Sequence, residues 1–236
     1  MASAPPLQVG SGYLLLPGTS PSDRLDLNHG FAVNPDLSTP AAPNTPNDDE
    51  WTIEFWIYFD PRVSPSYPQH VFGDPSAANF DCRTTNGSNL VLSATGLNSL
   101  TLTGLSAQTW HHVAFVFDVT AYSAPPRFPS AANLVGYLDG NVVATIPQAN
   151  PSFSATGTSS SGLAIGGSGT QPSLRGRIDE FRMWFHRRTR CQLIEQRNWK
   201  LPLWEQFAPY GLPPEHPDAP NPFAGLATLD PTVFGS

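Results

Sequence analysis

The sequence contains few charged residues and has no excess of basic ones. Only 13% of its 236 residues are charged, about half the share in an average globular domain. The net charge of -7 excludes a nucleic-acid-binding function, because such proteins use a basic surface to displace the counterions of phosphates. No apolar run approaches the roughly 18 residues that a membrane-spanning helix needs. We therefore expect neither nucleic acid nor a membrane among its partners.

Cysteine is scarce, and the first residues do not resemble a secretory leader. Cys82 and Cys191 are the two cysteines, too few for a disulfide framework, and we expect two reduced, half-buried thiols. Residues 1–10, MASAPPLQVG, have neither the basic start nor the apolar stretch of a signal peptide. We therefore predict a location in the cytoplasm before release, or on the surface of a virion that leaves by assembly or lysis.

Proline is abundant but unevenly distributed. Most of the 26 prolines lie in residues 1–50 and 202–236, and residues 76–124 have none. Because proline cannot donate to a sheet ladder, central strands exclude it. We predict an N-terminal arm over residues 1–12, a β domain over residues 13–200 and an extended, proline-rich C-terminal arm over residues 201–236. Aromatic residues are too frequent in the C-terminal arm for a solvated tail, so we expect them to anchor it on a neighbouring protein chain or on its own domain: Trp204, Phe207, Tyr210, Phe223 and Phe234.

Alternating apolar residues predict strands between these arms. The odd-numbered residues of WTIEFWIYF (51–59) form an apolar row that we assign to the core, and WHHVAFVFD (110–118) repeats the pattern. Residues 133–146 are typical of a hairpin, with Asp139-Gly140 in a two-residue turn that favours positive φ. Shorter or less regular strands are predicted over residues 90–92, 100–102, 163–165 and 176–185. One helix is predicted over residues 190–199, where Thr189 and Gln192 fit a capping box. This pattern indicates an all-β, antiparallel two-sheet sandwich with one short helix.

Five motifs along the chain carry a resemblance to a known family: WTIEFWIYFDP, WHHVAFVFD, GYLDGNVVAT, LAIGGS and GRIDEFRMWFHRRT. In this order they resemble the laminin-G-like/pentraxin branch of the concanavalin A-like jelly rolls. Residues 13–27, with YLLLPG and DRLDL, look like the first strand pair of that family. The resemblance implies a jelly roll of two curved sheets that binds glycans or proteins, often with one calcium ion and usually without catalysis. Residues 119–132, a longer proline-rich insertion, and the C-terminal arm depart from the family pattern.

Two charged residues stand among aromatic ones on strands that we predict to be neighbours. Glu54 lies outside the apolar row of its strand, and Arg182 lies within GRIDEFRMWF. A charge among aromatic side chains is costly unless it is paired, so we predict that Glu54 and Arg182 form a buried ion pair that fixes strand register. The acid-x-acid-x-x-acid strand signature of one large glucanase family of this fold is absent. His111 and His112 alternate to opposite faces, and no Ser-His-Asp set is visible in the sequence. We therefore expect no catalytic residues and no enzyme activity.

Two further sets of residues are candidates for ligand contacts. Trp56, Tyr58 and Trp110 belong to the outer faces of their strands, where they either stack on sugar rings or lie beneath an arm. Calcium needs six to eight oxygen ligands, and loop residues that can contribute are Asp74, Asn79, Asp81 and Asp118. None of them fits a compact calcium-loop motif, so calcium stays an open alternative.

The sequence leaves three functions open. We favour a non-catalytic structural or decorating component of a large assembly, such as the capsid or tail surface of a virion, because a jelly-roll body is combined with low charge and two proline-rich arms. The alternative is a glycan-binding or adhesion module that recognises cell-surface polysaccharide, with or without calcium. The third is a glycoside hydrolase, which needs two carboxylates about 5–5.5 Å or 6.5–9.5 Å apart across a cleft. We expect an oligomer or a place in an assembly.

Overall fold

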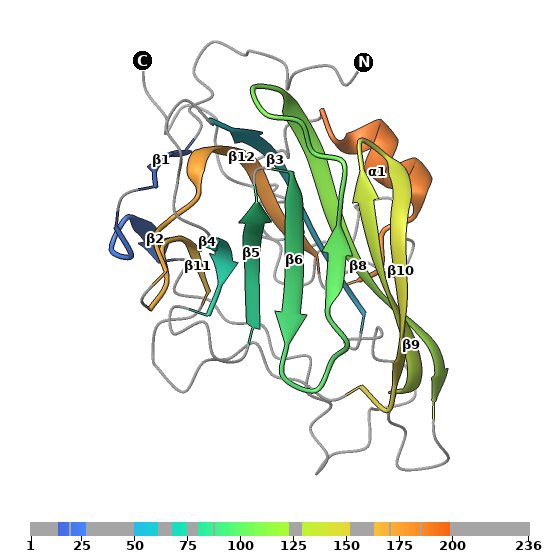
Figure 1. Ribbon diagram of the computed structural model, residues 1–236. Helices are drawn as coiled ribbons and strands as arrows, with labels where there is room; N and C mark the ends of the chain where they lie inside the picture. Colours follow the sequence, from blue (N-terminus) through green and yellow to red (C-terminus); the bar gives the residue numbers. More distant parts are fainter. Residues whose placement is uncertain are drawn as a thin grey trace, which may run out of the picture. The chain divides into compact units, whose positions relative to one another are not determined.

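The described part of the chain forms two antiparallel sheets of six strands each (Figure 1). The computed structural model describes residues 14–18, 20–26, 50–60, 68–74, 80–86, 88–122, 129–151, 163–169, 171–184 and 186–198. Sheet A contains, in spatial order, β1 (Leu14–Pro17), β12 (Arg175–Trp184), β3 (Trp51–Phe59), β8 (Trp110–Tyr122), β9 (Pro129–Leu138) and β10 (Asn141–Ala149). Sheet B contains β2 (Arg24–Asp26), β11 (Ala164–Gly166), β4 (Gln69–Gly73), β5 (Phe80–Asn86), β6 (Asn89–Ala94) and β7 (Leu100–Leu102). Neighbours far apart in sequence, such as β1 and β12, give the crossovers of a jelly-roll sandwich, so the predicted fold class is confirmed.

Both predicted arms fall outside this part of the chain. Residues 1–12 and 201–236 lie outside the described residues. The N-terminal arm, the C-terminal arm and the domain boundaries at residues 13 and 200 therefore stay predictions. So do the proposed anchors of the C-terminal arm: Trp204, Phe207, Tyr210, Phe223 and Phe234.

The core lies between the two sheets, where the alternation of β3 places it. The odd-numbered residues of β3, from Trp51 to Phe59, are at most 4% exposed and belong to one hydrophobic core. Phe72 of β4 connects the sheets, with ring centroids 5.5 Å from Phe55 and 6.4 Å from Phe115 of sheet A. Its ring also lies 6.0 Å from Phe80 and 5.3 Å from Phe181. These contacts make Phe72 the centre of an aromatic cluster.

The two cysteines differ in their surroundings. Cys82 of β5 is fully buried in the core, and Cys191 is exposed on the helix; neither forms a disulfide. Burial raises the pKa of the Cys82 thiol well above its ordinary value. The prediction of two half-buried thiols is therefore wrong, because Cys82 alternates into the core with Phe80 while Cys191 occupies the outer face of its helix.

Two strands extend further than the apolar pattern predicts. β8 continues to Tyr122 and β9 begins at Pro129, and their ladder pairs Tyr122 with Pro129. The predicted insertion over residues 119–132 is therefore partly strand. Proline is compatible with the first residue of a strand, where it removes no central ladder bond.

The helix, α1 (Arg190–Gln196), begins as the sequence predicts. The Thr189 side chain accepts from the Gln192 amide, and the Gln192 side chain accepts from the Thr189 amide, which completes the capping box. Leu193 packs against Ala114 and Val116 on the outer face of sheet A. Among the described residues, no helix has the length and apolar character needed to cross a membrane.

The helix ends at Gln196 rather than at the predicted Trp199. Arg182 donates to the Gln196 carbonyl at 2.9 Å, and the Trp56 indole donates to the Arg197 carbonyl at 3.0 Å. These side chains from sheet A satisfy carbonyls that a helix end leaves unpaired. Contacts across the fold, which the local sequence does not show, therefore set this end of the helix.

Candidate functional site

A network of charged and polar side chains lies on the outer face of sheet A, beneath the segment that carries α1. Glu54 is 1% exposed and stands opposite Arg182 in the register of β3 and β12. Arg182 Nη1 lies 3.7 Å from Glu54 Oε1, so the structure brings together the two residues that the sequence suggested as a pair. Their contact joins two central strands of the sheet.

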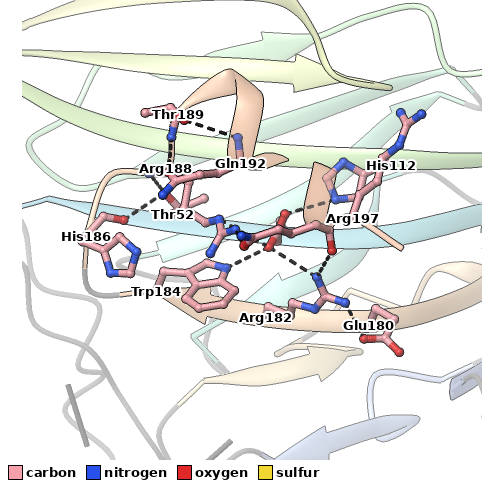
Figure 2. A network of polar contacts seen from close by, with 12 residues as sticks. Thr52, His112, Glu180, Arg182, Trp184, His186, Arg188, Thr189, Gln192 and Arg197 are labelled. Carbon is pink, nitrogen blue, oxygen red and sulfur yellow. Dashed lines mark hydrogen bonds and ion pairs between the residues drawn. The ribbon is translucent and has the colours of Figure 1, made fainter. Parts of the chain in front are cut away.

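The carboxylate has three further neighbours that sequence reasoning missed. Trp184 donates its indole N–H to Glu54 Oε1 at 2.8 Å, and Arg188 Nε lies 3.9 Å from the same oxygen. His112 Nε2 lies 3.2 Å from Glu54 Oε2. Figure 2 shows that His112, Arg182 and Trp184 point toward a common centre from β8 and β12, while Arg188 approaches from the segment before α1. We call these five residues the Glu54 network.

Further hydrogen bonds fasten residues 186–197 onto the sheet. The Thr52 hydroxyl donates to the His186 carbonyl and accepts from the Arg188 amide, both at 3.0 Å (Figure 2). Arg188 also stacks on Trp184, with its guanidinium 4.0 Å from the ring centroid. These contacts hold residues 186–197, and with them α1, against sheet A. The charged members of the Glu54 network are all nearly inaccessible to solvent, so the network offers no surface to a ligand.

The surroundings of Glu54 keep its carboxylate ionised. Burial raises the pKa of Glu54, but the contact with His112 and the charges of His112, Arg182 and Arg188 outweigh burial and bring it below the ordinary value. His186, at the edge of the same segment, has a pKa lowered to about 4 by burial and by the Arg188 charge. Near neutral pH, residues 186–197 therefore lie against a Glu54 side chain that carries its negative charge.

Trp56 is not available as a ligand contact. Its side chain is 0% exposed, its indole N–H donates to the Arg197 carbonyl at 3.0 Å, and its ring meets that of His112 with centroids 5.4 Å apart. Of the two alternatives for Trp56, a sugar contact or a place beneath other residues, its burial fits the second. Arg197, at the end of α1, lies over it, and periodicity alone cannot show such a cover.

The other two aromatic candidates lie together, next to the covered region. Tyr58 and Trp110 stand directly opposite each other in β3 and β8, with ring centroids 5.6 Å apart. Arg177 of β12 is opposite Tyr58 and holds its guanidinium 5.1 Å from the Tyr58 ring centroid. Leu15 of β1 is opposite Arg177 and is 62% exposed. These four residues form one line across four strands, which we call the aromatic row.

A glycine lets the strands that carry the row approach each other. Gly176 precedes Arg177, and a Cβ at this position would lie 2.0 Å from the Tyr58 carbonyl oxygen. Any other residue would push β12 away from β3 at the row. Tyr58, Trp110 and Arg177 are each half-buried, so the sheet fixes their orientation while part of each ring or guanidinium faces outward.

The acidic candidates for calcium do not form one site. Asp81 contacts His70 and Arg83 on sheet B, with 3.2 Å between Asp81 Oδ1 and His70 Nε2. Asp118 lies on sheet A and pairs with Arg187 at 2.7 Å. Asp74 is buried after β4, and Asn79 lies outside the described residues. Asp81 and Asp118 belong to different sheets and are not brought together. The described residues contain no group of three or more His, Cys, Asp or Glu side chains that could hold a metal ion.

A third polar cluster joins the loop before β8 to the β9–β10 hairpin. The Ser106 hydroxyl lies 2.8 Å from His111 Nε2, and His111 Nδ1 lies 2.8 Å from Asp139 Oδ2. Asp139 occupies the predicted turn with a φ of 54°. Sequence reasoning missed both partners of His111, because Asp139 is 28 positions away and serine is common in loops.

Comparison with known proteins gives one family match. The model of the concanavalin A-like lectin/glucanases superfamily matches residues 31–193. A search of curated proteins found no match.

Among solved structures, a protein of Bacteroides ovatus described as carbohydrate binding is 20% identical with a TM-score of 0.46, covering 62% of this chain and 40% of that one. The IT-sialidase CBM40 of Ruminococcus gnavus bound to alpha2,3 sialyllactose is 17% identical with a TM-score of 0.47, covering 62% and 80%. The SAP-like pentraxin of Limulus polyphemus is 16% identical with a TM-score of 0.43, covering 61% and 68%. The chain thus spans less than half of the Bacteroides protein.

Proposed function

Because this chain belongs to the concanavalin A-like lectin/glucanase superfamily, we propose that it is a glycan-binding module whose ligand lies on the aromatic row. The observation that carries this proposal is the alignment of Leu15, Arg177, Tyr58 and Trp110 across four strands on one face. Adjacent strands are about 4.8 Å apart, so the row is about 14 Å long, which suits a short stretch of a sugar polymer.

The side chains of the row suit a carbohydrate chemically. Tyr58 and Trp110 present flat rings with polar tips, against which the C–H face of a sugar ring can pack. Arg177 adds a planar group of N–H donors at the edge of this surface, which suits hydroxyl or carboxylate oxygens. The rings are held by their sheet and lose little conformational entropy on binding. The row therefore supplies apolar contact, hydrogen-bond donors and rigidity together.

Substituting the rings tests the proposal. We expect Tyr58→Ala and Trp110→Ala each to weaken binding to cell-surface polysaccharides by about 30-fold, since a central aromatic contact contributes about 2 kcal/mol. Binding is measured on a glycan array and by titration calorimetry against the best ligand, with calcium and with a chelator. Tyr58→Phe keeps the ring and is expected to retain most of the affinity.

Val143→Ala is the matched control, because Val143 is an exposed residue on β10 at the opposite side of sheet A. It should leave binding unchanged, and thermal melts should show that all variants are folded. A wild-type chain that binds no polysaccharide in either condition, or ring variants that bind like Val143→Ala, would contradict the proposal.

A second candidate function is a structural part of a large assembly, such as a virion. It is favoured by the sequence of residues 201–236, where aromatic residues recur between prolines. Under this proposal the C-terminal arm binds neighbouring chains, and the jelly-roll body faces outward.

Light scattering on the full chain tests the assembly role. We expect an oligomer that Trp204→Ala with Phe207→Ala converts to folded monomers, because buried aromatic anchors dominate interface energies. A wild-type chain that is monomeric at high concentration would rule out this role and leave the glycan proposal intact.

A further inference from the structure

Ser106, His111 and Asp139 form a continuous chain of hydrogen bonds at the rim of the sandwich. Ser106 lies in the loop between β7 and β8, His111 lies in β8, and Asp139 opens the turn between β9 and β10. The Ser106 Oγ to His111 Nε2 distance is 2.8 Å, and the His111 Nδ1 to Asp139 Oδ2 distance is also 2.8 Å. Ser106 and His111, five residues apart, and Asp139, 28 residues after His111, thus bring a hydroxyl, an imidazole and a carboxylate together.

The hydrogen bonds also determine which nitrogen of His111 carries the proton. The backbone N–H of Ser106 donates to His111 Nε2 at 3.0 Å, and an amide cannot accept in return, so Nε2 must be the unprotonated nitrogen. Nδ1 then carries the proton and donates it to Asp139. This is the tautomer in which imidazole can take a proton from a neighbouring hydroxyl.

Asp139 is held in the orientation that this arrangement requires. Its second oxygen, Oδ1, accepts from the His112 backbone amide at 2.9 Å, and its own amide donates to the His112 carbonyl at 2.8 Å. Burial raises the pKa of Asp139, but the hydrogen bonds from His111 and His112 lower it further than burial raises it. Both carboxylate oxygens therefore have fixed donors, and Asp139 is a positioning residue for His111.

Ser106, His111 and Asp139 differ in their exposure to solvent. The His111 ring is buried at 7% exposure and Asp139 is partly buried, whereas Ser106 is exposed. The base is shielded from water, and the serine belongs to the exposed surface. A nucleophile hydrogen-bonded to a base that a third group orients is the general pattern of an activated serine.

We propose that Ser106 is a reactive serine that takes an acyl group from small activated esters at the protein surface. The Ser106 oxygen forms a bond to the ester carbonyl carbon, the bond from that carbon to the leaving alkoxide or phenoxide breaks, and the hydroxyl proton moves to His111 Nε2. The leaving group or solvent then takes this proton, so that acyl-Ser106 and the free alcohol are the products. This activity is separate from glycan binding, since it uses none of the residues of the aromatic row.

The test uses the full chain, p-nitrophenyl acetate and a fluorophosphonate probe, with modified peptides located by mass spectrometry. We expect Ser106 to be labelled about 100-fold faster than Ser88, because general-base assistance contributes about 10² to 10⁴. Ser88 is the internal control: it is also exposed, but its hydroxyl contacts Asn86 and Asn89 and no histidine. Ser106→Ala should abolish the fast labelling.

The Asp139→Asn variant distinguishes activation of Ser106 by His111 from reactivity that is due only to the exposure of Ser106. Asparagine tolerates the positive φ of this turn, so the hairpin is retained, but His111 loses the carboxylate that orients it. We expect labelling of Ser106 to fall by about tenfold or more while the melting curve still shows a folded protein. Labelling of Ser106 at the Ser88 rate, or a rate that Asp139→Asn leaves unchanged in a folded protein, would overturn the proposal.

Discussion

Replacing Glu54 with glutamine is expected to lower the free energy of unfolding by about 3–5 kcal/mol, the usual cost of removing one partner from a buried ion pair. Glutamine still accepts the hydrogen bond from Trp184, but it provides no negative charge for Arg182, Arg188 and His112. For a chain of this length, about 2–4 °C of melting temperature is lost per kcal/mol. Thermal and urea unfolding should therefore show a fall of roughly 6–20 °C.

Asp118→Ala is the matched control for this variant. It removes the carboxylate of the Arg187–Asp118 pair, which is closer, at 2.7 Å, than the 3.7 Å of the Glu54–Arg182 pair but lies at the surface. Exposed pairs contribute about 0–1 kcal/mol, so the control should unfold nearly like the wild type. Equal effects of the two substitutions would show that burial of the Glu54 network adds nothing to stability.

Acid should remove the same stabilisation. The folded-state pKa of Glu54 is below its ordinary value of 4.5, so the folded protein binds this proton more weakly than the unfolded chain does. The stabilisation is fully present above about pH 4.5 and is lost as the pH falls through the folded-state pKa. The difference in unfolding free energy between wild type and Glu54→Gln should therefore shrink in urea titrations below pH 4.5.

Phe72→Ala is expected to destabilise the protein by about 3–5 kcal/mol, because it leaves a cavity that the surrounding rings can fill only in part. Phe72 is 0% exposed and contacts aromatic rings from both sheets, so the loss affects the centre of the sandwich. Urea unfolding measures the change. Phe72→Leu keeps most of the apolar volume and should cost clearly less; equal losses for alanine and leucine would contradict a packing origin.

Local patterns predicted those parts of the fold that depend on neighbours in sequence. The alternation in residues 51–59 places Ile53 and Phe55 in the core, and the Thr189–Gln192 spacing marks the start of α1, because both signals lie within a few residues. Glu54 and Arg182 were also predictable as partners, since a charge among aromatic residues needs a counter-charge.

The sequence did not predict features that depend on contacts between distant segments. The same alternation places Trp56 on the outer face, but Arg197, at the end of α1, lies over it and accepts the hydrogen bond from its indole. Arg188 reaches Glu54 from a loop whose path no periodicity describes. Asp139 reaches His111 from a turn 28 positions away, and one serine in the nearby loop gives no sign that its hydroxyl lies beside this histidine.

The helix covers only part of the outer face of sheet A, and this division separates two sets of positions on the same strands. Glu54 and Trp56 anchor α1, while Tyr58, two residues further along β3, belongs to the uncovered part. A library that varies Tyr58, Trp110 and Leu15 would therefore sample new recognition properties without touching the anchor. Diversification of one half, in the laboratory or over evolutionary time, can proceed while the other half keeps the domain intact.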